Sequence, residues 1–500
     1  MRILITGATG LLGSKLFNLL VREHDVSGTC FTQSKKSKQF LDIRDKELVF
    51  KHFENFRPDV VVHTAAMSNA DFCELNKEKA REINVIGTKN VAKASKIYNA
   101  KLVYISSDYI FNGMSKKSYE EDSKPEPINY YGKTKLEGEL IVKKLNNYLI
   151  VRPTILYGFN HYSTKETYVD NVINELSSGK ELFVDNKIIK FPLLLDDLTN
   201  AIKELINKEV EGTFNIGSAR GVTKYEWAQI IADTFSLDKS LIKESTGNNL
   251  VIKPENVCFS SRKIKGTINV GIKNIDLGMQ IYKAQKGCMF RMIYSVKPDQ
   301  LVLGQNASTY RINLGKKLAE EQPVEADAVM PVPESGIFGA TGYSAQSKIP
   351  LYFGIIRDYY TRKTLFETNK GLRSELLRQK LIFVPDLIKN KRIVVVDEAI
   401  LSGTTLEFVI ARLKREGAKE IHVRIPSPPM RFNCKFNVLG AEANLLAKEF
   451  RELQNYEEYK LTFEDRLKKN FGVDSLRFLS MKSFLKFMGS DFEPCTFCFR

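Results

Sequence analysis

The N-terminal segment constrains the fold of this chain more than any other part of the sequence. Arg2–Thr6 has the apolar character of a buried strand, and it leads through Gly7, Gly10 and Gly13 into a helix expected over Leu11–Arg22. Glycine permits a tight turn, a close approach of the backbone to a pyrophosphate, and close packing of the helix on the strand. Backbone N–H groups at the helix N-terminus then face the phosphates. The three glycines are therefore predicted to bind a dinucleotide.

The first half of the chain continues to alternate short apolar strands with amphipathic helices. We expect further strands at Val60–Thr64, Leu102–Ser106 and Tyr148–Arg152, and helices at Lys77–Tyr98 and Tyr131–Leu145. This rhythm is typical of an α/β protein with a doubly wound parallel sheet of the Rossmann type. The pattern then becomes less regular, as expected of a small substrate lobe.

A similar rhythm resumes in the second half. Strands are expected at Ala328–Pro331, Leu351–Ile355, Arg392–Val396 and Glu420–Arg424, with a helix at Leu406–Glu416. A chain of 500 residues is longer than one ordinary domain. We therefore predict two α/β domains, residues 1–286 and residues 287–500.

The composition is that of a globular protein and argues against several classes. Hydrophobic residues make up 43% of the chain, and no apolar run approaches the ~18 residues of a membrane helix. The net charge of +16 comes from lysines interleaved with acids, without a zinc finger or an aromatic and basic RNA-binding motif. The first residues lack the pattern of a signal peptide. We expect a cytoplasmic protein that binds neither membranes nor nucleic acids.

A tyrosine and a lysine stand four residues apart in the helix expected from Tyr131. Tyr131 and Lys135 therefore share one helical face. An ammonium close to a phenol lowers the pKa of the phenol, which can then exchange a proton with a carbonyl or an alcohol while a hydride moves. Ser107 follows the end of a predicted strand, where its hydroxyl would be able to hydrogen-bond the same substrate oxygen.

The end of the second strand bears on the choice of cofactor. Cys30–Gln33 contains no acid for the adenosine ribose, and Ser34, Lys35 and Lys36 follow at once. An acid at this point is typical of NAD sites, whereas a cation accommodates the 2′-phosphate of NADP. The sequence therefore favours NADP(H) and leaves NAD(H) open.

With these motifs, the first half resembles the extended short-chain dehydrogenases of the dTDP-4-dehydrorhamnose reductase type. The match also includes Leu41–Ile43, His63–Ala66, Ser106–Phe111 and Val151–Pro153. The resemblance implies three catalytic residues: Ser107, Tyr131 and Lys135. It also implies that Asp42 and Ile43 lie near the adenine and that Ala65 belongs to the cofactor site. Some relatives of this shape bind NADP and act as regulatory subunits.

The strongest motif of the chain lies in the second half. The apolar strand Arg392–Val396 ends in two carboxylates, Asp397 and Glu398, which suit ribose hydroxyls and a hard cation such as Mg²⁺. The loop that follows presents backbone N–H groups and hydroxyls to a phosphate, as phosphate nests do. It consists of Ser402, Gly403, Thr404 and Thr405. We predict a site for phosphoribosyl pyrophosphate.

From about Gly287 to Arg500, the chain resembles the phosphoribosyltransferase domain of amidophosphoribosyltransferase, which has the type I phosphoribosyltransferase fold. The match includes Met330–Gly336 and His422–Pro429, and Val473–Leu476 and Cys495–Phe499 extend it to the C-terminus. It implies that the pyrophosphate loop contains Glu334, Ser335 and Gly336. It also implies that Ser335, Asp397 and Glu398 hold Mg²⁺.

Departures from this family bear on activity. Asp397-Glu398-Ala399 stands where the family usually has two aspartates and a serine, Ser402 replaces an arginine, and the closing loop at residues 357–364 is altered. The family also carries a glutaminase domain whose second residue is a nucleophilic cysteine, whereas this chain has Arg2. Ammonia would therefore come from solution or from a partner, or the nucleophile is another molecule.

Four of the seven cysteines lie in the second half: Cys288, Cys434, Cys495 and Cys498. An odd number of cysteines argues against a disulfide framework. Four cysteines with one C-x-x-C pair fit a zinc site or an iron–sulfur centre, and free thiols are the remaining alternative. The resemblance favours a 4Fe–4S cluster, because some amidophosphoribosyltransferases hold one at these positions.

The two halves together predict a bifunctional enzyme. The first would reduce the carbonyl of a keto-sugar or nucleotide sugar with NAD(P)H. The second would transfer a phosphoribosyl group from phosphoribosyl pyrophosphate to ammonia or another nucleophile. One alternative is a regulatory or ligand-sensing protein that binds NADPH and phosphoribosyl pyrophosphate without turnover. In another, the first half is a scaffold beside an active transferase. We also expect a homo-oligomer.

Overall fold

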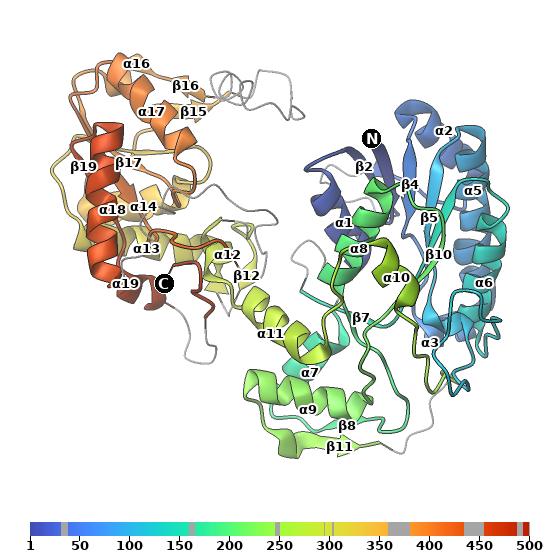
Figure 1. The fold of residues 1–500 in the computed structure, drawn as a ribbon. Coiled ribbons are helices and arrows are strands. Elements are labelled where there is room, and N and C mark those ends of the chain that lie inside the picture. The colour runs from blue at the N-terminus through green and yellow to red at the C-terminus, as the bar shows by residue number, and fades with distance from the viewer. Residues whose placement is uncertain are drawn as a thin grey trace. The chain divides into compact units, whose positions relative to one another are not determined.

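The chain divides into two compact units in a computed structural model (Figure 1). Unit 1 is Met1–Lys283 and unit 2 is Ala284–Arg500. The structure describes residues 1–31, 39–159, 166–245, 251–294, 296–302, 305–358, 381–434, 455–487 and 494–499. The predicted cofactor residues Ser34, Lys35 and Lys36, and the closing loop beyond Asp358, lie outside these residues.

Unit 1 is built on a seven-stranded parallel sheet in the order β10-β6-β5-β4-β1-β2-β3. Its strands are β1 (Arg2–Thr6), β2 (Asp25–Cys30), β3 (Gln39–Phe40), β4 (Val60–His63), β5 (Lys101–Ile105), β6 (Tyr148–Pro153) and β10 (Gly212–Ile216). The predicted doubly wound sheet is confirmed. The strand order reverses between β1 and β4, where sheets of this kind bind ligands.

Helices pack on both faces of this sheet because alternate residues of a strand point to opposite sides. Ile3 and Ile5 share a core with residues of α1, α8 and α10, whereas Leu4 packs with residues of α2, α5 and α6. The helices are α1 (Leu11–Leu20), α2 (Lys46–Phe56), α3 (Ala70–Leu75), α5 (Thr88–Ile97), α6 (Tyr130–Val142), α8 (Leu195–Asn207) and α10 (Arg262–Thr267).

The single helix expected over Lys77–Tyr98 is interrupted. The structure has α4 (Lys77–Arg81), then a π-helical turn over Glu82–Gly87, then α5. Asn84 in this turn accepts a hydrogen bond from the N–H of Met67 at 2.8 Å and donates one to its carbonyl at 3.0 Å. A widened turn of this kind is often found at functional sites, and here it lies beside the loop after β4.

The smaller lobe of unit 1 contains the less regular sequence after β6. Its strands form two parallel pairs, β7 (Leu156–Tyr157) with β9 (Leu193–Leu194) and β8 (Leu182–Val184) with β11 (Ile242–Glu244). Its helices are α7 (Tyr168–Ser177) and α9 (Lys224–Phe235). Trp227, the only tryptophan of the chain, is fully buried between the rings of Tyr157 and Tyr168.

Unit 2 contains a four-stranded parallel sheet in the order β14-β17-β18-β19. These strands are β14 (Ala328–Pro331), β17 (Arg392–Val396), β18 (Glu420–Ile425) and β19 (Ser475–Phe478). The helices are α12 (Met289–Tyr294), α13 (Ala307–Glu321), α14 (Ile337–Ser347), α16 (Pro385–Ile388), α17 (Thr404–Arg415), α18 (Tyr456–Phe471) and α19 (Met481–Leu485), and α11 (Ile275–Lys286) crosses the boundary between the units. Across both units, none of the helices in the described ranges is long and apolar enough to span a bilayer.

The strand expected at Leu351–Ile355 is wrong. Leu351 forms only an isolated parallel bridge with Val329, because just two backbone bonds, from Val329 to Pro350 and from Tyr352 to Val329, join the segment to β14. The chain then turns away and pairs β15 (Ile355–Arg357) with β16 (Leu381–Phe383) as an antiparallel hairpin.

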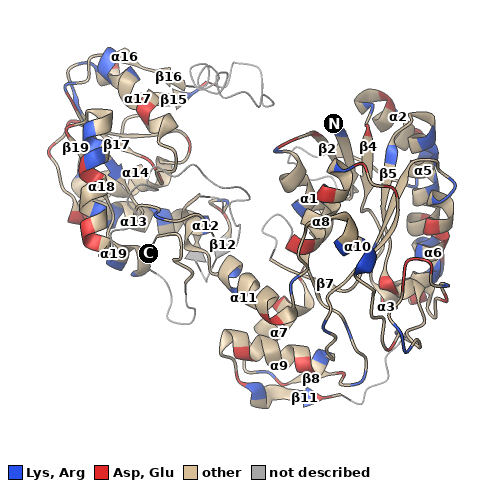
Figure 2. Ribbon diagram, viewed as in Figure 1, with Lys and Arg blue, Asp and Glu red and all other residues tan. Residues whose placement is uncertain are grey.

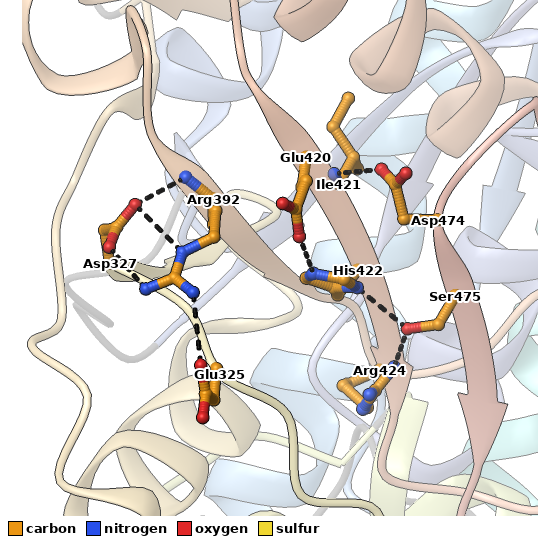
Figure 3. Close-up of polar contacts among 9 residues, drawn as sticks. All are labelled: Glu325, Asp327, Arg392, Glu420, Ile421, His422, Arg424, Asp474 and Ser475. Carbon is orange, nitrogen blue, oxygen red and sulfur yellow. Dashed lines mark hydrogen bonds and ion pairs between the residues drawn. The ribbon is translucent and has the colours of Figure 1, made fainter.

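Polar side chains join neighbouring strands of this sheet (Figure 3). Asp327, just before β14, pairs with the guanidinium of Arg392 at the start of β17 at 3.0 Å. Asp474, just before β19, accepts a hydrogen bond from the N–H of Ile421 on β18 at 2.7 Å. Both contacts lie where the strands begin. They leave the opposite edge, where the strands end, for the predicted site.

Candidate functional site

The glycine turn of unit 1 places backbone where a side chain would not fit. Gly7 follows β1 with φ +71°, and Gly10 caps α1. The N–H of Gly10 donates to the carbonyl of Gly7 at 3.0 Å. A Cβ on Gly13 would lie 2.3 Å from that carbonyl oxygen. The turn therefore needs glycine at positions 7 and 13. It leaves the N-terminus of α1 facing the predicted dinucleotide site.

Ala65 lies beside this turn, at the end of β4. A Cβ on Gly7 would approach its backbone to 2.8 Å. The hydroxyl of Thr64 donates to the carbonyl of Thr6 at 2.6 Å, which ties β4 to β1. His63, the last residue of β4, is buried. Burial is the main reason that the pKa of its imidazole is lowered to about 3, and the charge of Lys135 adds to this shift. A neutral histidine therefore supports the loop.

Asp42 and Ile43 follow β3. The sequence did not predict that the neighbouring Arg44 would take part in this site. Arg44 forms a charged pair with Asp42 at 2.7 Å, and this hydrogen bond is the main reason that the pKa of Asp42 is lowered. The guanidinium also lies 3.3 Å from Glu82 and 5.5 Å from the ring centre of Phe31, just after β2. A cation near the end of β2 can contact a dinucleotide ribose.

Ser107 and Tyr131 come together at the end of β5. Ser107 begins a short 3₁₀ turn, and its hydroxyl donates to Asp108 at 2.9 Å. Burial raises the pKa of the Tyr131 phenol, and a hydrogen bond with Ser107 opposes this rise. The sequence predicted the opposite direction. Burial outweighs any ammonium here, since Lys135 points its Nζ at the ring of Tyr104, 4.4 Å from the centre.

Lys135 is a buried lysine one turn further along α6. Its side chain has 3% of its surface exposed, and burial lowers the pKa of its ammonium to about 7. The nearby carboxylate of Glu139 opposes this change, but Glu139 itself is paired with Arg152 at 2.7 Å. Lys135 therefore titrates near neutrality and can take up or release a proton there.

Three lysines from the sequence after β6 lie close enough to affect one another's pKa, and we call Lys190, Lys224 and Lys253 the lysine cluster. The ammonium of Lys190 lies 5.1 Å from the ring centre of Tyr109, whose ring contacts that of Tyr131. Burial lowers the pKa of Lys190 and of Lys224, and the neighbouring lysines lower them further. Because these lysines are far apart in the sequence, no local pattern could have indicated the cluster.

In unit 2, β17 delivers Asp397 and Glu398 to the end of the sheet in different directions. Ser335 donates to Asp397 at 2.7 Å, which joins two of the three predicted Mg²⁺ ligands. Glu398 instead lies 3.5 Å from Arg311. Burial raises the pKa of Glu398 to about 8, and Arg311 opposes this rise. The sequence gave no hint of Arg311, which lies 87 positions away.

The predicted phosphate loop leads into α17. Gly403 caps the helix with φ +73°, and the hydroxyls of Ser402 and Thr404 lie 3.2 Å apart. Thr404 and Thr405 form its first turn, where backbone N–H groups are free to bind a phosphate. On the neighbouring loop, Gly336 caps α14, and Glu334 lies 3.9 Å from Arg357 of β15.

The four cysteines of unit 2 are neighbours drawn from separate segments. Cys288 forms a parallel bridge with Cys495, and the carbonyl of Cys498 accepts a bond from the N–H of Arg431 at 2.8 Å. Burial raises the pKa of the Cys288 thiol to about 12, and Cys434 and Cys495 add to the rise. Within the described ranges, no three or more His, Cys, Asp and Glu side chains form a metal-binding group. The predicted cluster and Mg²⁺ site are therefore not confirmed.

A family model described as the RmlD substrate binding domain matches residues 1–280, more than half of the chain. The chain belongs to this family. A second family model, the phosphoribosyl transferase domain, matches residues 311–426. The predicted family resemblance of each half is confirmed. This chain joins a reductase-like domain to a phosphoribosyltransferase domain.

The RmlD-like half matches most or nearly all of the length of its relatives. The structure of dTDP-4-dehydrorhamnose reductase from Bacillus anthracis in complex with NADP is 29% identical, with 56% of this chain and 98% of that chain covered and a TM-score of 0.52. The orthologue from Clostridium acetobutylicum is 31% identical with the same coverage and TM-score. Methionine adenosyltransferase 2 subunit beta of Rattus norvegicus is 32% identical over 280 residues, 54% of this chain and 83% of the relative.

Relatives of the other half are matched only in part. The amidophosphoribosyltransferase of Synechocystis is 36% identical over 217 residues, which are 43% of this chain and 41% of the relative. That of Methanocaldococcus jannaschii is 30% identical over 264 residues, 53% of each. The chain thus spans about half or less of the length of these relatives.

The titration of Lys135 predicts a pH-dependent stability difference. The unfolded lysine has a pKa of about 10.4, and the folded one has a pKa of about 7. Between these values the unfolded chain binds more protons, so the stability of the wild type rises with pH. Lys135→Met removes this dependence. Its gain in the free energy of unfolding over the wild type should be largest below pH 7 and should shrink towards pH 10.

Urea unfolding followed by the fluorescence of Trp227 measures this difference for unit 1. Lys133→Met, on an exposed lysine of the same helix, controls for the loss of one positive charge. A gap between Lys135→Met and the wild type that stays constant from pH 6 to pH 10 would contradict the prediction.

Proposed function

We propose that this chain is a bifunctional enzyme. Unit 1 reduces the carbonyl of a keto-sugar or nucleotide sugar with NAD(P)H. Unit 2 transfers a phosphoribosyl group from phosphoribosyl pyrophosphate to ammonia or another nucleophile. The observation that carries the proposal is that each unit gathers its chemical groups where parallel strands end: Ser107 beside Tyr131 in one, and Ser335 bonded to Asp397 in the other.

The reduction needs a hydride and a proton. When bound, the dinucleotide supplies the hydride to the carbonyl carbon. Tyr131 is suited to give its phenolic proton to the carbonyl oxygen, because burial keeps the phenol protonated. Ser107 orients the same oxygen, and Lys135 titrates near neutrality and can help restore the proton afterwards. The product is an alcohol.

The substrate of unit 1 is proposed to be anionic. Two members of the lysine cluster, Lys190 and Lys224, have no ion-pair partner within 4 Å among the described residues, whereas Lys253 pairs with Asp71 at 3.5 Å. Phosphate groups of a nucleotide sugar would satisfy these ammonium groups. For the cofactor we favour NADP(H), with Arg44 as a candidate contact to the ribose. The complex of the Bacillus anthracis reductase with NADP supports this choice.

In unit 2, the helix N-terminus at Gly403–Thr405 suits the 5-phosphate. Asp397 and Ser335 are placed to hold Mg²⁺ and the ribose hydroxyls. Magnesium would neutralise the leaving pyrophosphate as the nucleophile attacks C1 of the ribose. We propose that the ammonia is supplied by solution or by a partner.

The second candidate is a regulatory protein that binds NADPH and phosphoribosyl pyrophosphate without turnover. Two observations favour it. A relative in the same family is named as a subunit of methionine adenosyltransferase 2, and Glu398 pairs with Arg311 instead of joining Asp397 and Ser335. Turnover in either unit would exclude this alternative.

We also propose a 4Fe–4S cluster at Cys288, Cys434, Cys495 and Cys498. The support is the closeness of the four thiols, since each of the other three affects the pKa of Cys498. A four-iron cluster is larger than a single ion, so its thiolates need not converge on one point. Its role would be structural, joining the segments that begin at Cys288 and end at Cys498.

Tyr131→Phe tests the reductase assignment. Loss of a general acid typically lowers a rate by ~10²–10⁴-fold, so the variant should lose turnover of nucleotide keto-sugars to that extent while keeping its NADPH affinity. Tyr130→Phe is the matched control and should change neither. Assays of NADPH oxidation measure the turnover, and fluorescence titration measures the NADPH affinity. An absence of NADPH and NADH binding by the wild type would end the assignment.

Asp397→Asn combined with Glu398→Gln tests the phosphoribosyl pyrophosphate site. Both the cation and the ribose hydroxyls lose charged acceptors, so calorimetry with Mg²⁺ should show strongly weakened binding. Asp386→Asn with Glu416→Gln removes two carboxylates elsewhere in unit 2 and should leave the affinity unchanged. Equal affinity of the first pair and the wild type would contradict the assignment.

Cys495→Ser tests the cluster. Wild-type protein purified without oxygen should be brown and contain iron and sulfide. The variant should lose both and melt at a lower temperature, with a smaller effect on phosphoribosyl pyrophosphate affinity. Cys258→Ser, in unit 1, serves as the control. A colourless anaerobic preparation, with stoichiometric zinc or with no metal, would show that the assignment is wrong.

A further inference from the structure

A buried arginine in unit 2 contacts one of the two carboxyl groups that follow β17. Arg311 lies on α13, and 7% of its side-chain surface is exposed. Its Nη1 atom lies 3.5 Å from Oε1 of Glu398, whose side chain is equally buried. Among the described residues, Glu398 is the site residue that the guanidinium of Arg311 contacts. Any effect of Arg311 on the site is therefore expected to pass through Glu398.

The other nitrogens of Arg311 fix the plane of its guanidinium. Its Nε donates to the carbonyl of Met292 at 2.9 Å, and its Nη2 donates to the carbonyl of Val296 at 2.8 Å. A guanidinium is planar and rigid, so three contacts in different directions determine its position. Both acceptors follow Cys288 within one short segment. Arg311 is thus a cation held at a defined place.

The helix that carries Arg311 is itself held by close contacts with α14. A Cβ on Gly342 of α14 would lie 1.9 Å from the carbonyl oxygen of Ile312, and a Cβ on Gly315 would lie 2.0 Å from that of Gly339. Helix backbones this close cannot slide past each other without a clash. Because α14 begins directly after Ser335-Gly336, one pair of helices holds both Arg311 and the loop of Ser335.

The two neighbouring carboxylates are kept apart by different partners. Asp397 accepts hydrogen bonds from Ser335 at 2.7 Å and from the N–H of Glu398 at 2.9 Å. Glu398 turns to Arg311 instead. The contact with Arg311 at 3.5 Å gives the Glu398 side chain a partner other than Asp397 and Ser335.

We propose that Arg311 is a positioning residue of the phosphoribosyl pyrophosphate site. It holds Glu398 in one orientation, so that Asp397 and Ser335 face the ligand in a fixed geometry. The inference rests on the proposed function, namely that unit 2 binds phosphoribosyl pyrophosphate with Mg²⁺. It adds a residue that contacts neither the ligand nor the metal.

Calorimetry of the full chain with phosphoribosyl pyrophosphate and Mg²⁺ tests the proposal. Arg311→Met should weaken binding by about 10- to 100-fold, the usual effect of losing a residue that orients a ligand-binding group. Arg311→Lys keeps the charge but cannot make all three contacts, and it should retain part of the affinity. Since Arg311 and Glu398 act through one contact, Arg311→Met with Glu398→Gln should bind no more weakly than the weaker single variant.

Arg424→Met is the matched control for lost stability. Arg424 is also buried in unit 2, and it donates to the carbonyl of Gln322 at 3.0 Å. It also donates to the hydroxyl of Ser475 at 2.9 Å (Figure 3). This variant should lower the melting temperature and leave the affinity unchanged. If Arg311→Met does not fold, Arg311→Lys alone and with Glu398→Gln supplies the same comparison.

Three outcomes overturn the proposal. Wild-type affinity in Arg311→Met and Arg311→Lys would show a purely structural role. Additive losses in the double variant would show that Arg311 does not act through Glu398. A wild type that does not bind phosphoribosyl pyrophosphate would refute the proposed function itself, and this inference with it.

Discussion

Parallel strands of one sheet end at the same edge, and in both units this edge is where the polar groups gather. In unit 1, β1, β4 and β5 are neighbours in the sheet, and the glycine turn, Ala65 and Ser107 follow them. In unit 2, β14 and β17 are neighbours, and Ser335 and Asp397 follow them. The apolar strands are buried on both faces, so the chain can place polar chemistry only where they stop.

Burial has a second consequence at these edges, because it disfavours charge. It lowers the pKa of Lys135 to about 7 and raises the pKa of Glu398 to about 8. Each group has a buried neighbour of opposite charge, Glu139 for Lys135 and Arg311 for Glu398. Charged groups spread along the surface of a lysine-rich chain carry little information about function (Figure 2). The buried ones carry much more, since a buried charge needs a specific partner.

Local sequence patterns predicted β1, β14 and β17 with their observed ends, and the motifs that follow those strands. Contacts between distant positions could not be predicted. Arg311 reaches Glu398 across 87 positions, and the lysine cluster comes from three segments, so neither has a local pattern. The expected pKa of Tyr131 had the wrong direction because spacing places a lysine on the same helical face but does not reveal burial. The single helix expected over Lys77–Tyr98 was wrong, because a π-helical turn interrupts it where Asn84 hydrogen-bonds to the distant backbone of Met67.

Release of pyrophosphate is the most direct test of the proposal that unit 2 transfers a phosphoribosyl group. The full-length protein would be incubated with phosphoribosyl pyrophosphate, Mg²⁺ and ammonium, with and without NADPH, and assayed for pyrophosphate. We expect release that needs Mg²⁺ and ammonium and that is lost in Asp397→Asn. Tight binding of phosphoribosyl pyrophosphate without any release, with ammonium or with other amines, would contradict transfer and favour a ligand-sensing protein.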